Sequence, residues 1–222
     1  MKKITSILFS ILFIISSLFY LISEFITISL CEASYNGYIY NTISELALPK
    51  GMLWHNTPSS FSPLALLMNL ALIISGILFF ISYTFSIKNY LKKSFRPYGI
   101  FLALLVAIGS ILVAIFHGGK DYLGIHEIST SFVFIGGNLC IILTMLFLNE
   151  KKLIFKTIGI FLGIIGILSS IVIFYTSITN KTQILAILER LAVYPIIIFE
   201  LMIGIYTLKK ALKIKKSPKT KY

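Results

Sequence analysis

The sequence predicts an all-α polytopic membrane protein, a bundle of six transmembrane helices with a short interfacial helix in the first outer loop. Of its 222 residues, 57% are hydrophobic and only 13% are charged, whereas soluble domains are nearer half apolar and a quarter charged. The apolar residues gather in runs of about twenty, the length that crosses a hydrocarbon core roughly 30 Å thick. We therefore expect one membrane bundle, 1–212, and a basic tail, 213–222.

The first apolar run follows Lys2 and Lys3, and each later run is bounded by polar or basic residues. A cleaved signal peptide is the alternative for the first run, but its hydrophobic part is about 27 residues long, against 7–15 in a signal peptide. The third run ends in the polar sequence FHGGKDYLGIHE, and the sixth contains a proline. The six expected spans are about 4–30, 62–87, 98–116, 128–148, 157–178 and 191–208.

The positions of the basic residues predict the topology. Sixteen of the twenty lysines and arginines fall at the chain ends and in the second and fourth connections, and four fall on the other side. Because positive charge marks cytoplasmic loops, we expect a multi-pass protein of the cell membrane with both termini in the cytoplasm. The lysine-rich tail is interpreted as a determinant of this topology and a disordered end, with binding to anionic lipid headgroups as the alternative. Its placement beside a span argues against nucleic-acid binding.

The interfacial helix is predicted by the sequence NTISELALPKG in the first outer loop. Thr42 and Glu45 have the spacing of a capping box, in which each side chain bonds the backbone amide of the other residue. Pro49 and Gly51 then end the helix, so we expect it over 43–48. Glu45 is thereby explained as a cap before it is explained as a catalytic group.

The sequence FHGGKDYLGIHE, 116–127, is expected to form the turn before the fourth span. His117 is expected at the carboxyl end of the third helix and Glu127 in the first turn of the fourth, where the helix dipole favours their charges. His126 and Asp121 have no such explanation. No zinc-ligand spacing is present, so we expect no metal, and His117 and His126 are only weak candidate ligands.

The sixth span carries a second set of polar residues. Arg190 is expected to reach Glu45, Asp121 or Glu127 on another segment, while Glu189 lies beside it. Pro195 removes a helical hydrogen bond. Glu200 lies near the middle of the span, where an acid costs roughly 3 kcal/mol and usually faces the bundle interior. Its expected partners are the interior amides of Asn69 and Asn138.

Three motifs together resemble the domain-of-unknown-function 998 family of small prokaryotic, often archaeal, integral membrane proteins. They are NTISELA (41–47), the histidine-containing turn before the fourth span, and ERLAVYP (189–195), in the same order as in the family. Glu45 and Ala47 depart from the family's usual ISDLG-like string, and the turn lacks a proline. The resemblance implies a six-span fold and one cluster on the outer face, formed by Ser44, Glu45, His126, Glu189 and Arg190. It implies no activity.

The favoured interpretation is an accessory or structural membrane component with an outward-facing polar cluster, whose protein partners are unknown. A membrane-embedded hydrolase or lipid-modifying enzyme is one alternative, with His126 or His117 as general base and Glu45 or Asp121 as its partner. A small proton-coupled transporter that uses Glu200 is the other. No cofactor is expected. The candidate site residues are Ser44, Glu45, Asp121, His126, Glu189 and Arg190, with the intramembrane polar residues Glu200, Asn69 and Asn138.

Overall fold

The computed structural model describes residues 2–30, 37–49, 53–54, 57–58, 62–117, 123–179 and 184–213. Six of its helices are long and apolar enough to cross a membrane. The predicted six-span helical fold is therefore confirmed, with the short helix of the first loop also present. The structure also has an antiparallel pair of two-residue strands, β1 (Leu53–Trp54) and β2 (Thr57–Pro58).

Five spans are built on one long helix each: α1 (Lys2–Ser29), α4 (Ala65–Phe85), α5 (Arg96–Ile115), α8 (Leu153–Thr179) and α9 (Leu185–Lys213). The fourth span is composite. It consists of α6 (Leu123–Ser131), a π-helical stretch (Phe132–Gly136) and α7 (Gly137–Phe147). Short π-helical insertions often occur at functional sites, and this one faces the bundle interior through Val133 and Phe134.

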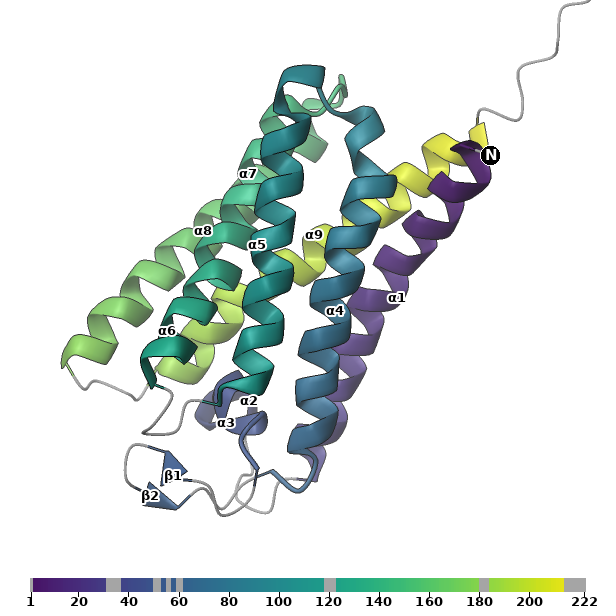
Figure 1. Cartoon of the computed structure of the whole chain (residues 1–222). Helices are drawn as coiled ribbons and strands as arrows, with labels where there is room; N and C mark the ends of the chain where they lie inside the picture. The colour runs from purple at the N-terminus through teal and green to yellow at the C-terminus, as the bar shows by residue number, and fades with distance from the viewer. Residues whose placement is uncertain are drawn as a thin grey trace, which may run out of the picture.

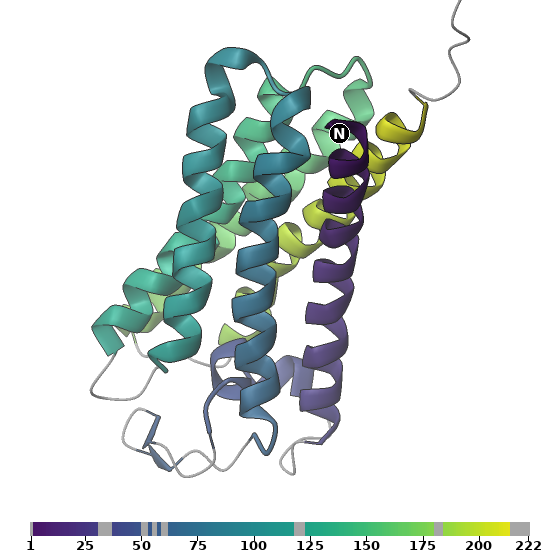
Figure 2. The ribbon, with the colours of Figure 1, turned by 45° about the vertical axis from the view of Figure 1, so that its right-hand side comes forward.

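The spans form a closed ring rather than a flat row. Neighbours in the ring are α1, α4, α5, the composite α6–α7, α8 and α9, and α9 packs back against α1. Figure 1 shows α9 running obliquely behind α4 and α5, and Figure 2 shows the amino-terminal end of α1 beside the carboxyl-terminal end of α9. The first and last spans are therefore antiparallel neighbours.

The opposite ends of the ring differ in character. We call "the loop end" the end that carries α2 (Gly37–Tyr40), α3 (Ile43–Leu46) and the β1–β2 pair (Figure 1). The other end, "the lysine-rich end", holds the two 3₁₀ turns at Ile87–Tyr90 and Lys93–Phe95. There the connections of α4 with α5 and of α7 with α8 are joined by the bridge between Leu91 and Leu148.

An exposed ion pair lies at the lysine-rich end. The Lys210 ammonium is 3.0 Å from the Glu150 carboxylate, and the lysine side chain is 45% exposed. This hydrogen bond from Lys210 lowers the pKa of Glu150 to about 2. The Glu150 side chain is only 8% exposed, but the lysine end of the contact is open to solvent and salt, so the pair stabilises the fold by no more than about 1 kcal/mol.

Helix ends differ from the expected spans because backbone hydrogen bonding continues beyond the lipid-embedded part. Helix α9 begins at Leu185 rather than near 191, since LAILE consists of good helix formers. Helix α6 begins at Leu123, so Glu127 lies in its second turn. The expectation that Glu127 occupies the first turn is wrong, and no charge–dipole explanation applies to it.

Asn138 joins three helices in the middle of the bundle. Its Nδ2 donates to the carbonyls of Phe134, in the π-helical stretch, and of Ala192, at 2.7 and 2.8 Å. Ala192 lies in the turn before Pro195, where the proline removes a helical N–H donor. Gly166 of α8 provides the space for the Asn138 amide, which lies where a side chain at Gly166 would begin.

Gly166→Ala is expected to destabilise the protein by about 1–3 kcal/mol, because the added methyl overpacks the Asn138 amide. The measurement is the thermal midpoint of the purified protein in detergent. Gly124→Ala is the matched control, since a Cβ at Gly124 meets no atom within 4 Å. Equal midpoints for the two variants would contradict the role of Asn138 in joining the helices.

Candidate functional site

The site is built along the interface between α1 and α9, where a row of polar contacts forms what we call the polar seam. Polar side chains recur along α1 at intervals of three, four or seven residues and meet polar side chains of α9. Ser10 Oγ lies 2.7 Å from Thr207 Oγ1, Ser17 Oγ donates to Glu200 Oε2 at 3.3 Å, and the third contact is an ion pair. A seven-residue repeat keeps one helix face against its neighbour, so these contacts lie one after another along the bundle.

The ion pair joins Arg190 to Glu24. Arg190 Nε lies 2.9 Å from Glu24 Oε1, and their side chains are 7% and 0% exposed. Arg190 Nη1 donates to the carbonyls of Asn41 and Ala186 at 2.8 and 3.0 Å, and Tyr194 Oη donates to Glu24 Oε2 at 3.1 Å. The expectation that Arg190 engages Glu45, Asp121 or Glu127 is therefore wrong, because the acid in the first span lies on the facing helix.

Tyr38 of α2 completes this network at the loop end. The Arg190 guanidinium lies 5.1 Å from the centre of the Tyr38 ring, a distance at which an aromatic face attracts a cation. Burial, with a smaller contribution from the Glu24 charge, raises the pKa of Tyr38, so its phenol remains neutral. The network therefore ties α1, α2 and α9 together around one buried positive charge.

Glu45 acts as the predicted cap. Glu45 N donates to Thr42 Oγ1 at 3.0 Å, and Thr42 N donates to Glu45 Oε2 at 2.8 Å. The capping box is confirmed, although α3 ends at Leu46 rather than near 48. This carboxylate is directed to its own helix start.

Ser44, His126 and Glu189 form a second network, separate from the Arg190 network. Ser44 donates to Glu189 through both its backbone N and its Oγ, each at 3.2 Å. The same Oγ lies 3.3 Å from His126 Nε2, and His126 Nδ1 lies 2.9 Å from the Phe116 carbonyl oxygen. All three side chains are buried. The sequence-predicted cluster is thus divided, with Ser44, His126 and Glu189 brought together.

A serine beside an oriented histidine has the geometry of a nucleophile and its general base. Acyl transfer also requires N–H donors that are free to bind an oxyanion. Here the amide of Ser44, at the start of α3, is already bonded to the Glu189 carboxylate. The arrangement is therefore suited to holding or passing a proton, and it is poorly suited to hydrolysis.

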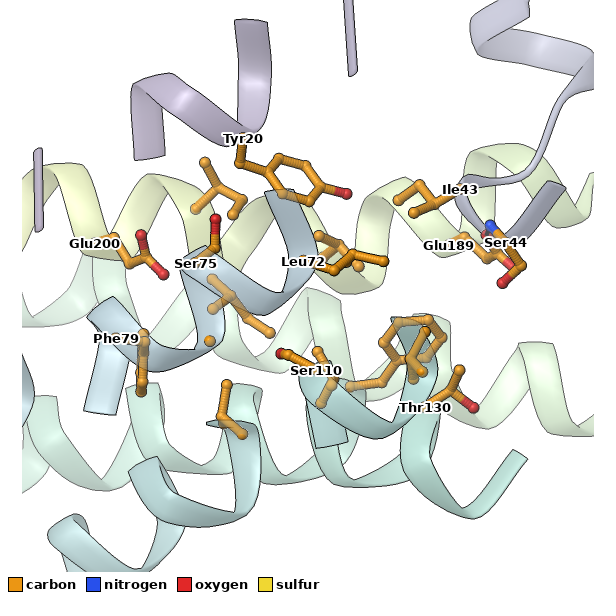
Figure 3. Close-up of a pocket in the computed structure, with 18 residues that line it drawn as sticks. Tyr20, Ile43, Ser44, Leu72, Ser75, Phe79, Ser110, Thr130, Glu189 and Glu200 are labelled. Carbon is orange, nitrogen blue, oxygen red and sulfur yellow. Dashed lines mark hydrogen bonds between the residues drawn. The ribbon is translucent and has the colours of Figure 1, made fainter. Parts of the chain in front are cut away.

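A cavity of about 50 Å³ lies inside the ring. Glu200 is at one end and Glu189 with Ser44 at the other, as Figure 3 shows. The two acids are eleven residues apart on α9, or about 16 Å along a helix. The hydroxyls of Tyr20, Ser75, Ser110 and Thr130 lie between them on the cavity wall, which is otherwise apolar.

The prediction that Asn69 and Asn138 are the partners of Glu200 is wrong. Asn69 Nδ2 donates to the Ala47 carbonyl at 2.8 Å, and Asn138 is occupied in the helix junction described above. Glu200 instead accepts its hydrogen bond from Ser17 of α1. A small hydroxyl is therefore the nearest polar partner of the most deeply buried acid of the sixth span.

Aromatic rings close the cavity on the side of the lysine-rich end. Phe13, Phe79 and Phe199 are fully buried. The Phe79 ring lies 5.8 Å from Phe13 in an edge-on contact and 6.5 Å from Phe199. Beyond these rings, Ser10 Oγ contacts both Thr207 and Ser86, the latter at 2.9 Å. The polar seam is therefore interrupted by one apolar layer.

In the part of the chain that the structure describes, no three His, Cys, Asp or Glu side chains lie close enough together to hold a metal ion. His117 follows α5 and faces a groove beside Asn69, away from the central cavity. Burial lowers the pKa of His117, which favours the neutral imidazole. Asp121 lies outside the described residues.

Sequence reasoning missed the polar seam of α1. Glu24 stands out in the sequence only as an acid of the first span, and Ser17 and Tyr20 stand out only when the spacing of polar residues along that span is compared. The signal was present, because Ser10, Ser17 and Glu24 follow one another at intervals of seven residues. Repeated polar residues on one face of a transmembrane helix indicate the face that packs against protein.

Arg190→Met is expected to cost about 3–5 kcal/mol of stability, because Glu24 is left as an unpaired buried charge. The double variant Arg190→Met with Glu24→Leu should recover most of that loss, since it removes both charges. Denaturation in detergent measures the free energy of unfolding of each variant. Lys210→Met, which breaks the exposed pair with Glu150, is the control and should cost less than about 1 kcal/mol. A double variant no more stable than Arg190→Met alone would contradict the pairing.

The family comparison covers most of the chain. Residues 9–206 match the family model described as "Protein of unknown function (DUF998)". The match includes both polar networks, the cavity and the aromatic layer. No curated protein and no solved structure matches the sequence. The chain is a member of the DUF998 family of proteins of unknown function.

Proposed function

We propose that the protein moves protons through the interior of its six-helix bundle, with Glu200 as the carboxyl group that binds them. The central cavity, with an acid at each end, is the observation that carries this proposal. Interior acids in membrane proteins commonly belong to ion and proton pathways.

The cavity is large enough to hold water between the two acids. Its volume of about 50 Å³ exceeds the 10–15 Å³ or so that one water molecule requires. The Tyr20 and Ser75 hydroxyls on its wall have no hydrogen-bond partner among the described residues. Buried water usually bonds to such unsatisfied groups, and a chain of waters and hydroxyls supports proton transfer between Glu189 and Glu200.

The two other functions have less support in the geometry. A hydrolase would need the N–H donor of Ser44 for its oxyanion, and Glu189 occupies that donor. An accessory or structural role explains the Arg190 network and the cap at α3. It provides no reason for a carboxyl group at the far end of the cavity, where removing an acid from water costs free energy.

We propose that the lysine-rich end lies on the cytoplasmic side of the cell membrane and that the loop end faces outward. The excess of lysine and arginine at that end supports this orientation. The basic residues from 213 onward would then meet anionic headgroups of the inner leaflet, each contributing about 1 kcal/mol.

Glu200→Gln is expected to reduce proton flux at least tenfold, because the amide cannot bind and release a proton at that position. Flux is measured in liposomes that contain the purified protein and a pH-sensitive dye, with a potassium gradient and valinomycin as driving force. Glu127→Gln is the matched control, because Glu127 is exposed on α6. Its flux should equal that of the unchanged protein.

Two outcomes would overturn the proposal. One is a flux no greater than that of protein-free liposomes. The other is a flux that Glu200→Gln leaves unchanged, accompanied by a higher melting temperature of that variant. In either case Glu200 is only a costly interior acid, and the accessory interpretation is favoured.

A further inference from the structure

We propose that Ser44 passes a proton between His126 and Glu189, forming a relay at the loop end of the cavity. This inference rests on the proposed movement of protons and names the groups through which they enter or leave. Three elements supply the relay, since Ser44 lies on α3, His126 on α6 and Glu189 on α9. The hydrogen bonds that join these three side chains carry the inference.

The hydrogen bond to the Phe116 carbonyl fixes the position of one proton on the His126 ring. A backbone carbonyl can only accept, so His126 Nδ1, at 2.9 Å from it, carries a hydrogen. The other ring nitrogen, Nε2, faces the Ser44 hydroxyl at 3.3 Å. Whether Nε2 donates or accepts then depends on where Ser44 directs its single hydrogen.

Ser44 has one hydrogen and two neighbours that can accept it. If the hydroxyl donates to Glu189 Oε1 at 3.2 Å, Nε2 must donate to Ser44, and the pair is an imidazolium and a carboxylate. If the hydroxyl instead donates to Nε2, the carboxyl group must donate to Ser44, and both groups are neutral. Each arrangement satisfies all of these hydrogen bonds, and the sum of the two charges is zero in both.

Conversion between the two arrangements is a balanced double proton transfer. The Nε2–H bond of His126 breaks as its proton binds Ser44 Oγ, while the original Ser44 proton moves to Glu189 Oε1. The Ser44 hydroxyl is regenerated with its hydrogen reversed. One proton has thereby moved from the imidazolium to the carboxylate, which also lines the cavity that ends at Glu200.

The two charged groups nearest the relay on α3 and α9 are held in contacts of their own. On α3, Glu45 caps its own helix. Across the bundle, Arg190 of α9 is bonded to Glu24 of α1. Among the described residues, the remaining titratable side chains near the relay are Tyr20 of α1, Tyr194 of α9 and His117 beyond α5. The proton exchange within the relay therefore breaks neither the cap at Glu45 nor the ion pair of Arg190 with Glu24.

The test compares Ser44→Ala with Ser44→Thr, which keeps a hydroxyl. Nitrogen NMR of histidine-labelled protein reports whether Nε2 of His126 carries a proton. In the original protein and in Ser44→Thr, its resonance should lie between the bare and protonated extremes and move with temperature. In Ser44→Ala it should stay fixed at one extreme. Proton flux should fall at least tenfold in Ser44→Ala and stay within about threefold in Ser44→Thr.

Ser170→Ala is the control, because Ser170 is another buried serine, on α8, whose hydroxyl donates to the Gly166 carbonyl of its own helix. It should leave flux and the His126 resonance unchanged. If Ser44→Ala does not fold, as judged by its melting curve, Ser44→Cys replaces it as a variant with a weak hydrogen-bond donor. An Nε2 resonance unaffected by loss of the Ser44 hydroxyl overturns the relay.

The two proposals fail separately. A flux that depends on Glu200 but is unchanged in Ser44→Ala, with an unchanged His126 resonance, overturns the relay and leaves proton movement standing. A flux absent in every variant overturns proton movement. If the His126 resonance still requires the Ser44 hydroxyl in that case, the relay stands as a local proton exchange.

Discussion

The ion pair between Arg190 and Glu24 constrains the rest of the bundle. A charge inside a membrane protein must be paired, and this pairing sets the register of α1 against α9. Once Glu24 meets Arg190, the helical repeat brings Ser17 to Glu200 and Ser10 to Thr207. The first and last spans therefore close the ring through one series of polar contacts, and the cavity forms on the inner side of that seam.

The short helix α3 depends on acids from two different sources. Glu45, within α3, accepts a hydrogen bond from the backbone N–H of Thr42 at the start of the helix. Glu189, on α9, accepts one from the backbone N–H of Ser44. The first loop is thereby held against the sixth span even though only four residues are helical. The same contact places the Ser44 hydroxyl between His126 and Glu189. The contact that holds the first loop therefore also positions the three side chains of the proposed relay.

The sequence predicted those features that depend on local pattern. Six apolar runs gave six spans, and the spacing of Thr42 and Glu45 gave the cap. The partners of Arg190 and Glu200 depend on which helices are neighbours, and hydropathy contains no information about the order of spans in a ring. Asn138 was expected beside Glu200 because both are interior and polar. The space at Gly166 instead lets its amide reach the Ala192 carbonyl of α9.

The two ends of the cavity are closed by physically different contacts. At the loop end the closure consists of hydrogen bonds among Ser44, His126 and Glu189, whose directions change with protonation. Toward the lysine-rich end it consists of the rings around Phe79, whose packing is insensitive to protonation and yields only to movement of side chains or helices. In the proposed pathway, a proton arriving from the loop end therefore alters the nearer closure directly. Access from the other end requires α1, α4 and α9 to shift. Pro195 lies on the cavity side of the layer of aromatic rings. Because proline has no N–H, α9 has one hydrogen bond fewer there to resist bending.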